Sequence, residues 1–325
     1  MRPQLFRLLD VGAPSYFILL LTGFVLGTAI AALWARRLGQ NPDSLIDLGI
    51  AMAFSGLVGA RLLHVVADGF FWDYVHLCTD PSLVDWHITR AECASPAYAG
   101  VWDEAKKVCH PSGQNCWAWA NFMAGGLAYY GGFLGAAPVG WYLCRRDRIP
   151  FWKTADVVGF IIPLGLAFGR MGCLLVGCCF GKPTAGAMGL SFPPHSAASE
   201  WQHKAGLLGG PDLASLAVHP TQIYESALSL AIAFFCLLVA HPRKRYHGQV
   251  FLTFVALYSV ARFAIEFFRS DDRGGLVGLS TSQLIGLGLL AFCAAMHRRL
   301  RPPPAPPAPP PASVYRAGTG PTAAA

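Results

Sequence analysis

The chain has 325 residues, of which 54% are hydrophobic and 13% are charged, and its formal net charge is +7. Because a soluble domain carries about a quarter charged residues, this composition excludes an ordinary soluble protein. The basic residues lie in short segments beside apolar runs, so the positive charge indicates membrane topology and no nucleic-acid partner.

Seven apolar stretches each have roughly the 20 residues needed to cross the hydrocarbon of a bilayer. We therefore predict an all-α polytopic membrane protein. Its seven transmembrane helices form one domain, residues 1–300, and a disordered, Pro/Ala-rich cytoplasmic tail follows, residues 301–325. The predicted spans cover residues 15–35, 46–67, 121–144, 154–175, 222–240, 249–268 and 281–297.

Clusters of basic residues follow the first, third, fifth and seventh spans and set the predicted orientation. The clusters comprise Arg36 and Arg37, and residues within 145–153, 243–245 and 298–301. All four lie on the cytoplasmic side when the N-terminus is outside and the C-terminus is cytoplasmic. A cleaved signal peptide over residues 1–33 is the competing interpretation, but its apolar core is too long and arginines follow it directly.

Two long segments, residues 68–120 and 180–219, fall on the outer side in this orientation. The first is too long for a simple connection and predicts a folded cap on the outer face. It holds four cysteines, Cys78, Cys93, Cys109 and Cys116. An oxidising compartment favours two disulfides among them, with three pairings open, and a structural zinc site is the alternative.

Several ionisable residues lie at membrane depth, where burial is costly and function with a partner is the default interpretation. Arg170 is near the outer end of the fourth span. In the sixth span, Arg262, Glu266 and Arg269 are spaced i, i+4 and i+7, which places them on one helical face. Glu266 can pair with either arginine, which leaves one guanidinium for an anion. For Arg269 alone, snorkelling to the headgroups is the simpler interpretation.

The start of the fifth span places His219, Gln222 and Glu225 on successive turns of one face. Glycines border the same region, and they have two interpretations: close helix packing, or backbone N–H groups directed at an anion. Taken together, these residues predict a cavity below the outer leaflet that binds a phosphate. Guanidinium groups suit phosphate because they offer a fork of N–H donors, and the anion reachable from lipid is a phospholipid headgroup.

Four motifs resemble, in this order, those of the prolipoprotein diacylglyceryl transferase family: "GGLAYYGGFLGA", "GRMGCLLVGCCFG", "HPTQIYES" and "YSVARFAIEFFRSDD". The resemblance runs from about residue 14 to residue 297. It implies an enzyme of the bacterial inner membrane with its active site toward the outer leaflet. Such an enzyme transfers diacylglycerol from phosphatidylglycerol to the lipobox cysteine of a prolipoprotein and releases glycerol phosphate. The resemblance implies no cofactor and no metal.

By position, Arg170 resembles the arginine of the family signature and Arg262 resembles its second essential arginine. Together with His219 and Tyr130, these are the residues that we expect to be catalytic. The residues expected to bind the substrate are Arg61, Gln222, Tyr224, Glu225, Glu266, Arg269, Gly131, Gly132, Gly172, Gly177 and Gly181.

The chain departs from the family pattern at several polar positions. Tyr130 stands where the family commonly has the histidine of its "FHGG" motif. In the signature "GRxGNFxNGExxG", Cys173 and Val176 replace two asparagines and Cys178 replaces the glutamate. A catalytically altered relative that binds phospholipid or another anion, or one that uses a different acceptor, is therefore the alternative to transferase activity.

The transferase reaction requires a thiolate nucleophile and a stabilised phosphate leaving group. We expect Arg170 and Arg262 to stabilise that group, with Arg61 as a weaker helper, and His219 or Tyr130 to accept the proton. Three interpretations remain open for the signature cysteines Cys173, Cys178 and Cys179: apolar filler, a disulfide, or a metal or covalent-intermediate site.

Overall fold

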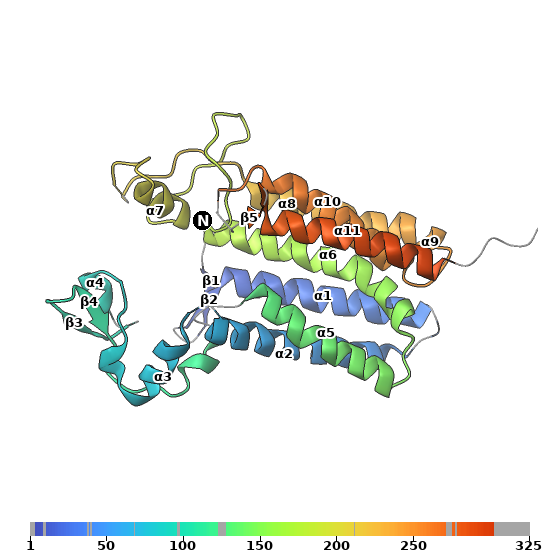
Figure 1. Ribbon diagram of the computed structural model, residues 1–325, viewed down its shortest axis with the longest axis horizontal. Helices are drawn as coiled ribbons and strands as arrows, with labels where there is room; N and C mark the ends of the chain where they lie inside the picture. Colours follow the sequence, from blue (N-terminus) through green and yellow to red (C-terminus); the bar gives the residue numbers. More distant parts are fainter. Residues whose placement is uncertain are drawn as a thin grey trace, which may run out of the picture.

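A computed structural model describes residues 4–301, except 9–10, 38, 40, 68, 96–97, 123–127, 211, 271–274 and 277. Almost all of the predicted disordered tail lies outside these residues, so the structure does not test that prediction. The long helices run side by side, and the smaller elements gather mainly at one end of them (Figure 1).

The long helices follow the predicted apolar stretches closely. They are α1 (Ser15–Arg37), α2 (Pro42–Ala67), α5 (Tyr129–Arg146), α6 (Phe151–Val176), α8 (Thr221–Phe235), α10 (Gln249–Glu266) and α11 (Thr281–Leu300). Helix α8 continues through a π-helical segment, η4 (Cys236–Ala240), into α9 (His241–Arg243). The third helix begins later than predicted, at residue 129 instead of 121, and a separate 3-10 turn, η2 (Ala118–Ala120), precedes it.

Among the described residues, five helices are long and apolar enough to cross a membrane: α1, α2, α6, α10, and α8 together with η4 and α9. This confirms the prediction of a helical, polytopic membrane protein. Helix α5 is rich in glycine and tyrosine, and α11 ends in a basic turn. Their membrane crossing, and with it the total of seven spans, stays a prediction.

The bundle is built from helix pairs: α2 with α5, α1 with α6, α6 with α8, and α10 with α11. Its largest buried cluster joins α1, α6, α8 and α10, and includes Phe160, Ile232 and Phe254. On the outward faces large apolar side chains remain exposed, for example Phe54 at 70% and Val260 at 56%. Continuous apolar exposure of this kind is what contact with lipid tails requires.

Glycines bring α2 and α5 into backbone contact. A Cβ added to Gly131 would clash with the carbonyl oxygen of Gly59, and one on Gly135 would clash with the carbonyl oxygen of Ser55. Small residues at such crossings let membrane helices pack closely. At Gly131 the structure thus shows the packing role that was one of the two interpretations of the glycines.

The segment between α2 and α5 folds into a small disulfide-bonded unit. It contains α3 (Phe71–Thr79), η1 (Pro81–Leu83), α4 (Arg90–Cys93) and the antiparallel strands β3 (Val101–Asp103) and β4 (Val108–His110). Disulfides join Cys78 to Cys116 and Cys93 to Cys109. The structure thereby selects one of the three pairings and leaves none of these thiols for zinc.

Further small elements lie at the same end of the bundle (Figure 1). They are the hairpin of β1 (Gln4–Leu8) and β2 (Val11–Pro14), helix α7 (Ala197–Lys204), and the hairpin of β5 (Gly275–Leu276) and β6 (Leu279–Ser280). The segment that carries α7 has its own buried cluster, which includes Phe180, Phe192 and Val218. This cluster fixes the chain where it leaves α6.

Candidate functional site

Arg170, on α6, forms a buried ion pair with Glu225, on α8. The distance from Arg170 Nη2 to Glu225 Oε1 is 3.0 Å, and the side chains are 18% and 2% exposed. The hydroxyl of Tyr258, on α10, donates to the same carboxylate oxygen at 2.9 Å. Three helices therefore meet at Glu225, and the guanidinium of Arg170 is held in one orientation by a carboxylate that is itself held.

Arg262 has its own carboxylate. Its Nη1 lies 2.7 Å from Glu266 Oε2, one turn along α10, and the side chains are 11% and 7% exposed. Its Nη2 donates to the hydroxyl of Ser282, on α11, at 3.4 Å. Glu266 therefore pairs with Arg262. The sequence had left Arg262 and Arg269 as alternative partners.

The two arginine sites are connected through α10, because Tyr258 and Arg262 are four residues apart and so share a helical face. Tyr258 contacts the carboxylate that holds Arg170, and Arg262 follows one turn later. That both guanidinium groups bind one phosphate stays a prediction.

Some buried acceptors at this site have no hydrogen-bond partner among the described residues, notably Glu225 Oε2 and Gln222 Oε1. A buried acceptor without a hydrogen bond lowers the free energy of unfolding by about 1–3 kcal/mol. Native structures therefore keep few such atoms, and each one needs an explanation. Both of these atoms belong to the "HPTQIYES" motif. The motif therefore carries acceptor capacity that the described part of the protein does not use.

The same motif also holds the loop that follows α6. Thr221 Oγ1 donates to the carbonyl of Cys179 at 2.7 Å, and Gln222 Nε2 donates to the carbonyl of Cys178 at 2.7 Å. The backbone N–H of Gly181 donates to the carbonyl of His219 at 2.9 Å. The family signature at the end of α6 and the motif at the start of α8 are therefore one structural unit.

His219 lies at the edge of this unit, partly exposed. Its Nδ1 is 3.4 Å from the hydroxyl of Tyr224, and its ring packs edge-on against Phe268 at 5.1 Å between centroids. The imidazole is thus positioned by two aromatic neighbours. The side chain of Tyr130, the other predicted proton acceptor, is outside the described residues.

Arg61, on α2, contacts the segment between α2 and α5, and its role beside the other two arginines stays a prediction. Its Nε donates to the carbonyl of Trp119 at 2.6 Å, and its Nη2 donates to the hydroxyl of Tyr74 at 2.9 Å and to the carbonyl of Ala118 at 3.1 Å. Arg61 is 2% exposed. These contacts make it the anchor of the disulfide-bonded unit on α2.

The remaining predicted residues occupy packed positions. Arg269 is buried, and its backbone pairs with Gly181. Gly172 lies against the backbone of Tyr16 on α1, Gly177 ends α6 with φ of 85°, and Gly132 faces α2. Substrate binding by these glycines stays a prediction.

Sequence reasoning missed three polar residues that the structure shows in buried interactions: Tyr258, Ser282 and Asp156. Tyr258 had a usable signal, because it is four residues before Arg262 in the same motif. Asp156 also had one, because it is an acidic residue inside a predicted span, whereas nothing in the sequence marked Ser282.

Fold and site together define a polytopic membrane protein with buried arginine–carboxylate pairs near one end of its bundle. The family model for prolipoprotein diacylglyceryl transferase matches residues 3–298, so the chain belongs to this family. It is similar to the phosphatidylglycerol–prolipoprotein diacylglyceryl transferase of Clostridium tetani, with 26% identity covering 88% of this chain and 93% of that protein. The protein of the same name from Clostridioides difficile is 31% identical over 82% of this chain and 83% of its own length.

Proposed function

We propose that this protein transfers the diacylglyceryl group of phosphatidylglycerol to the lipobox cysteine of a prolipoprotein, with release of glycerol phosphate. Family membership and the names of the relatives support this activity. The single structural observation that carries it is the buried Arg170–Glu225–Tyr258 group. It supplies a fixed cation beside a motif whose acceptors Glu225 Oε2 and Gln222 Oε1 have no partner among the described residues.

The active site faces the outer leaflet of the bacterial inner membrane, in a protein that crosses it seven times with its N-terminus outside. Two arginine-containing basic turns support this orientation. They end α5 and α11, at the end of the bundle opposite to the C-terminal end of α6, the helix that carries Arg170 (Figure 1). The disulfides of the unit between α2 and α5 support it as well, because disulfides persist in oxidising compartments.

In the proposed reaction the cysteine thiolate attacks the glycerol carbon that carries the phosphate ester. A C–S bond forms, the C–O bond to phosphate breaks, and the electron pair leaves with glycerol phosphate. Arg170 and Arg262 stabilise the charge that grows on the phosphate oxygens, a contribution that exceeds their binding of the substrate because the charge increases toward the transition state. The thiol proton passes to His219 or Tyr130.

Glu225, Tyr258 and Glu266 act as positioning residues in this scheme. Glu225 and Glu266 each pair with a guanidinium group, and Tyr258 donates to the carboxylate of Glu225. None of the three needs to change its protonation state during the reaction. Glu225 Oε2 and Gln222 Oε1 are the acceptors that we assign to the hydroxyl groups of the phosphatidylglycerol headgroup.

The test is transfer of labelled diacylglycerol from phosphatidylglycerol to a lipobox peptide by the purified protein in detergent. We expect Arg170→Ala and Arg262→Ala each to lower turnover by about 100-fold or more. Arg299→Ala, an exposed arginine near the end of α11, is the matched control and should keep wild-type turnover. Circular dichroism and the thermal midpoint report whether each variant is folded.

Near-wild-type turnover of the folded Arg170→Ala protein would show that this arginine does not stabilise the leaving group. Absence of transfer by the wild-type protein, together with retained phosphatidylglycerol binding, would replace the proposal with the lipid-binding alternative.

A further inference from the structure

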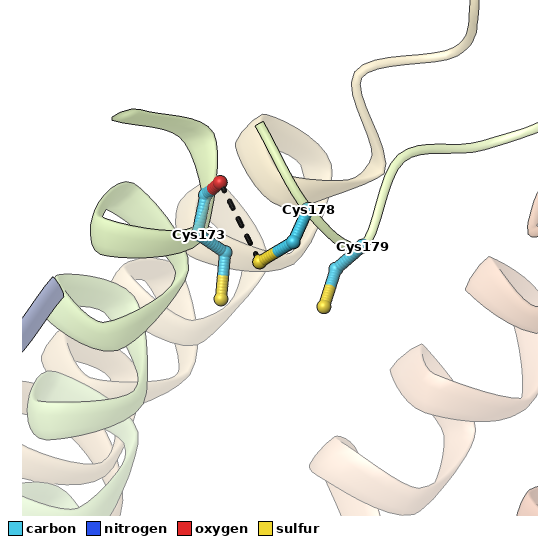
Figure 2. A group of neighbouring side chains, drawn as sticks. All are labelled: Cys173, Cys178 and Cys179. Atoms are coloured by element: carbon cyan, nitrogen blue, oxygen red, sulfur yellow. Dashed lines mark hydrogen bonds between the residues drawn. The ribbon is translucent and has the colours of Figure 1, made fainter. Parts of the chain in front are cut away.

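Three free thiols gather where α6 ends. The Sγ atoms of Cys173, Cys178 and Cys179 all lie within 4.8 Å of one another. Figure 2 shows the side chain of Cys173 on the helix and those of Cys178 and Cys179 on the loop that follows it. Cys173 is buried and the other two are half-buried. The four cysteines of the unit between α2 and α5 are paired in disulfides, whereas these three are not.

The backbone turns back on itself to make this cluster. Gly177 ends α6 in the left-handed region with φ of 85°, and Cys179 is left-handed as well with φ of 62°. The amides of Gly177 and Cys178 both donate to the carbonyl of Cys173, at 2.9 and 3.1 Å. A left-handed conformation is unfavourable for a residue with a side chain, so the surrounding structure must impose it at Cys179.

The constraint comes from α8 and from the cluster around α7. Thr221 and Gln222 hold the carbonyls of Cys179 and Cys178, and the next residue, Phe180, is buried with Phe192 and Val218. The backbone of both loop cysteines is thus fixed before any ligand binds, and the Cys178 thiol donates to the carbonyl of Cys173 at 3.8 Å (Figure 2). Such a preorganised group of ligands binds with little ordering cost.

We propose that Cys173, Cys178 and Cys179 form a three-coordinate thiolate site for a soft monovalent cation, Cu(I). With metal–sulfur bonds of roughly 2.3 Å, the sulfurs of a trigonal site stand roughly 4.0 Å apart. Small rotations of the side chains therefore close the observed cluster around one ion. Binding forms three metal–sulfur bonds, releases three protons to solvent and changes no oxidation state.

The donor set selects the metal. Thiolates are soft ligands that favour Cu(I), Zn(II) or iron–sulfur clusters over hard cations. Zn(II) in structural sites takes four protein ligands, whereas the group found among the described residues contains these three cysteines and no His, Asp or Glu. Three sulfurs without a fourth protein ligand suit Cu(I) best.

Nearby cations offset the charge of such a site. Three thiolates and Cu(I) carry a net charge of −2, and the guanidinium groups of Arg170, which also pairs with Glu225, and of Arg269 are near enough to Cys179 to offset part of it. A buried anionic group needs such partners, because an isolated charge is strongly disfavoured away from water. The proposal concerns metal binding alone and does not depend on the transferase activity proposed above.

The test offers Cu(I), as its bicinchoninate complex with ascorbate, to the full-length protein in detergent. Ascorbate keeps copper reduced without opening the structural disulfides. We expect the wild-type protein to withdraw one equivalent of copper and the C173S/C178S/C179S variant to withdraw none. The matched control is C144S/C236S/C293S, which removes the three isolated buried thiols and should still take one equivalent.

Cys178→Ser alone guards against misfolding of the triple variant, and it should lower Cu(I) affinity at least 10-fold while helix content is unchanged. X-ray absorption at the copper edge should show three sulfur neighbours. Equal copper uptake by the wild-type and triple variants, nitrogen or oxygen ligands at the copper, wild-type affinity in Cys178→Ser, or a third disulfide in the unreduced protein would each overturn the proposal.

Discussion

Two buried ion pairs lie toward opposite ends of α6, and they differ in how fully their carboxylates are used. Glu225 is 2% exposed and pairs with Arg170, which is 18% exposed; Asp156 is 0% exposed and pairs with Lys244, which is 17% exposed. Arg170 and Asp156 stand about 21 Å apart along the helix axis at 1.5 Å per residue. Burial alone does not distinguish these pairs.

Hydrogen bonding does distinguish them. Asp156 Oδ2 accepts from Lys244 Nζ at 2.9 Å, while its Oδ1 accepts from the backbone N–H groups of Val250 and Phe251 at 2.9 and 3.5 Å. It therefore caps the N-terminus of α10, where a negative charge is favourable. Both oxygens of Glu225 are buried, but Oε2 has no partner among the described residues. We therefore propose that the saturated pair serves the fold, and that the unsaturated pair keeps an acceptor for a ligand.

The largest effect that tests this comparison is on stability. Asp156→Asn leaves Lys244 with an amide in place of a carboxylate and weakens the cap, so we expect a loss of about 3–5 kcal/mol. Glu225→Gln also leaves a buried cation, Arg170, without a carboxylate, but it keeps an oxygen for Arg170 and Tyr258 and disturbs no helix cap, so it should destabilise less. Thermal midpoints measured in the same detergent compare the two variants.

Transferase turnover should show the reverse order. Glu225→Gln removes the charge that orients Arg170, and we expect it to lower turnover far more than Asp156→Asn does in the folded protein. The contradicting result is that Asp156→Asn, the less stable variant, is also the less active one. Stability alone would then explain both measurements, and the functional distinction between the two ion pairs would fail.

A smaller effect is expected from Tyr258→Phe, which removes one hydrogen bond to Glu225. A hydrogen bond to a charged group is worth about 1.5–3 kcal/mol. If about half of this serves to position Arg170, kcat/KM falls roughly 4- to 13-fold. Steady-state kinetics with varied phosphatidylglycerol measure it, and kcat should change more than KM because the arginine acts on developing charge.

Tyr246→Phe is the matched control for that variant, since the Tyr246 hydroxyl contacts His297 at the other end of the bundle. It should leave kcat/KM unchanged. An equal loss in both tyrosine variants would assign the effect to general loosening of the helices.

The helices were predictable from the sequence because apolar length is a local property. The first span was expected at residues 15–35 and the helix covers Ser15–Arg37; the sixth was expected at residues 249–268 and the helix covers Gln249–Glu266. The start of the third helix was not predictable. Residues 121–128 are apolar enough to belong to a membrane span, so the sequence offered no reason to begin the helix as late as Tyr129.

The partners within the site were harder to predict, because they depend on the register between helices. Spacing placed Arg262 and Glu266 on one face and thus allowed their pairing, but nothing local indicated that Arg170 would meet Glu225 on α8. Asp156 lay inside an apolar run, and its partner Lys244 is 88 residues away. The sequence motifs identified which side chains matter, and the three-dimensional packing determined which of them touch.

The smallest predicted effect concerns the disulfide-bonded unit between α2 and α5. Glu92 closes a capping box at α4, where its carboxylate accepts from the backbone N–H and the hydroxyl of Thr89, both at 2.8 Å. The N–H group, and then the hydroxyl, lower the pKa of Glu92 below its usual value of 4.5. A lowered pKa means that the carboxylate stabilises the folded unit above pH 4.5, and that this contribution is lost as the pH falls through the lowered value.

Glu92→Gln removes that titration, because an amide does not ionise. Hydrogen exchange of the peptide around Thr89, compared between wild type and variant at one pH so that intrinsic rates cancel, should show weaker protection in the variant at pH 7. The difference should shrink at pH 3. The two arginine sites lie within the helix bundle, so hydrogen-exchange protection of the peptides around them should not differ between wild type and variant at either pH. A difference in protection that stays constant from pH 7 to pH 3 would mean that the cap acts through neutral hydrogen bonds alone.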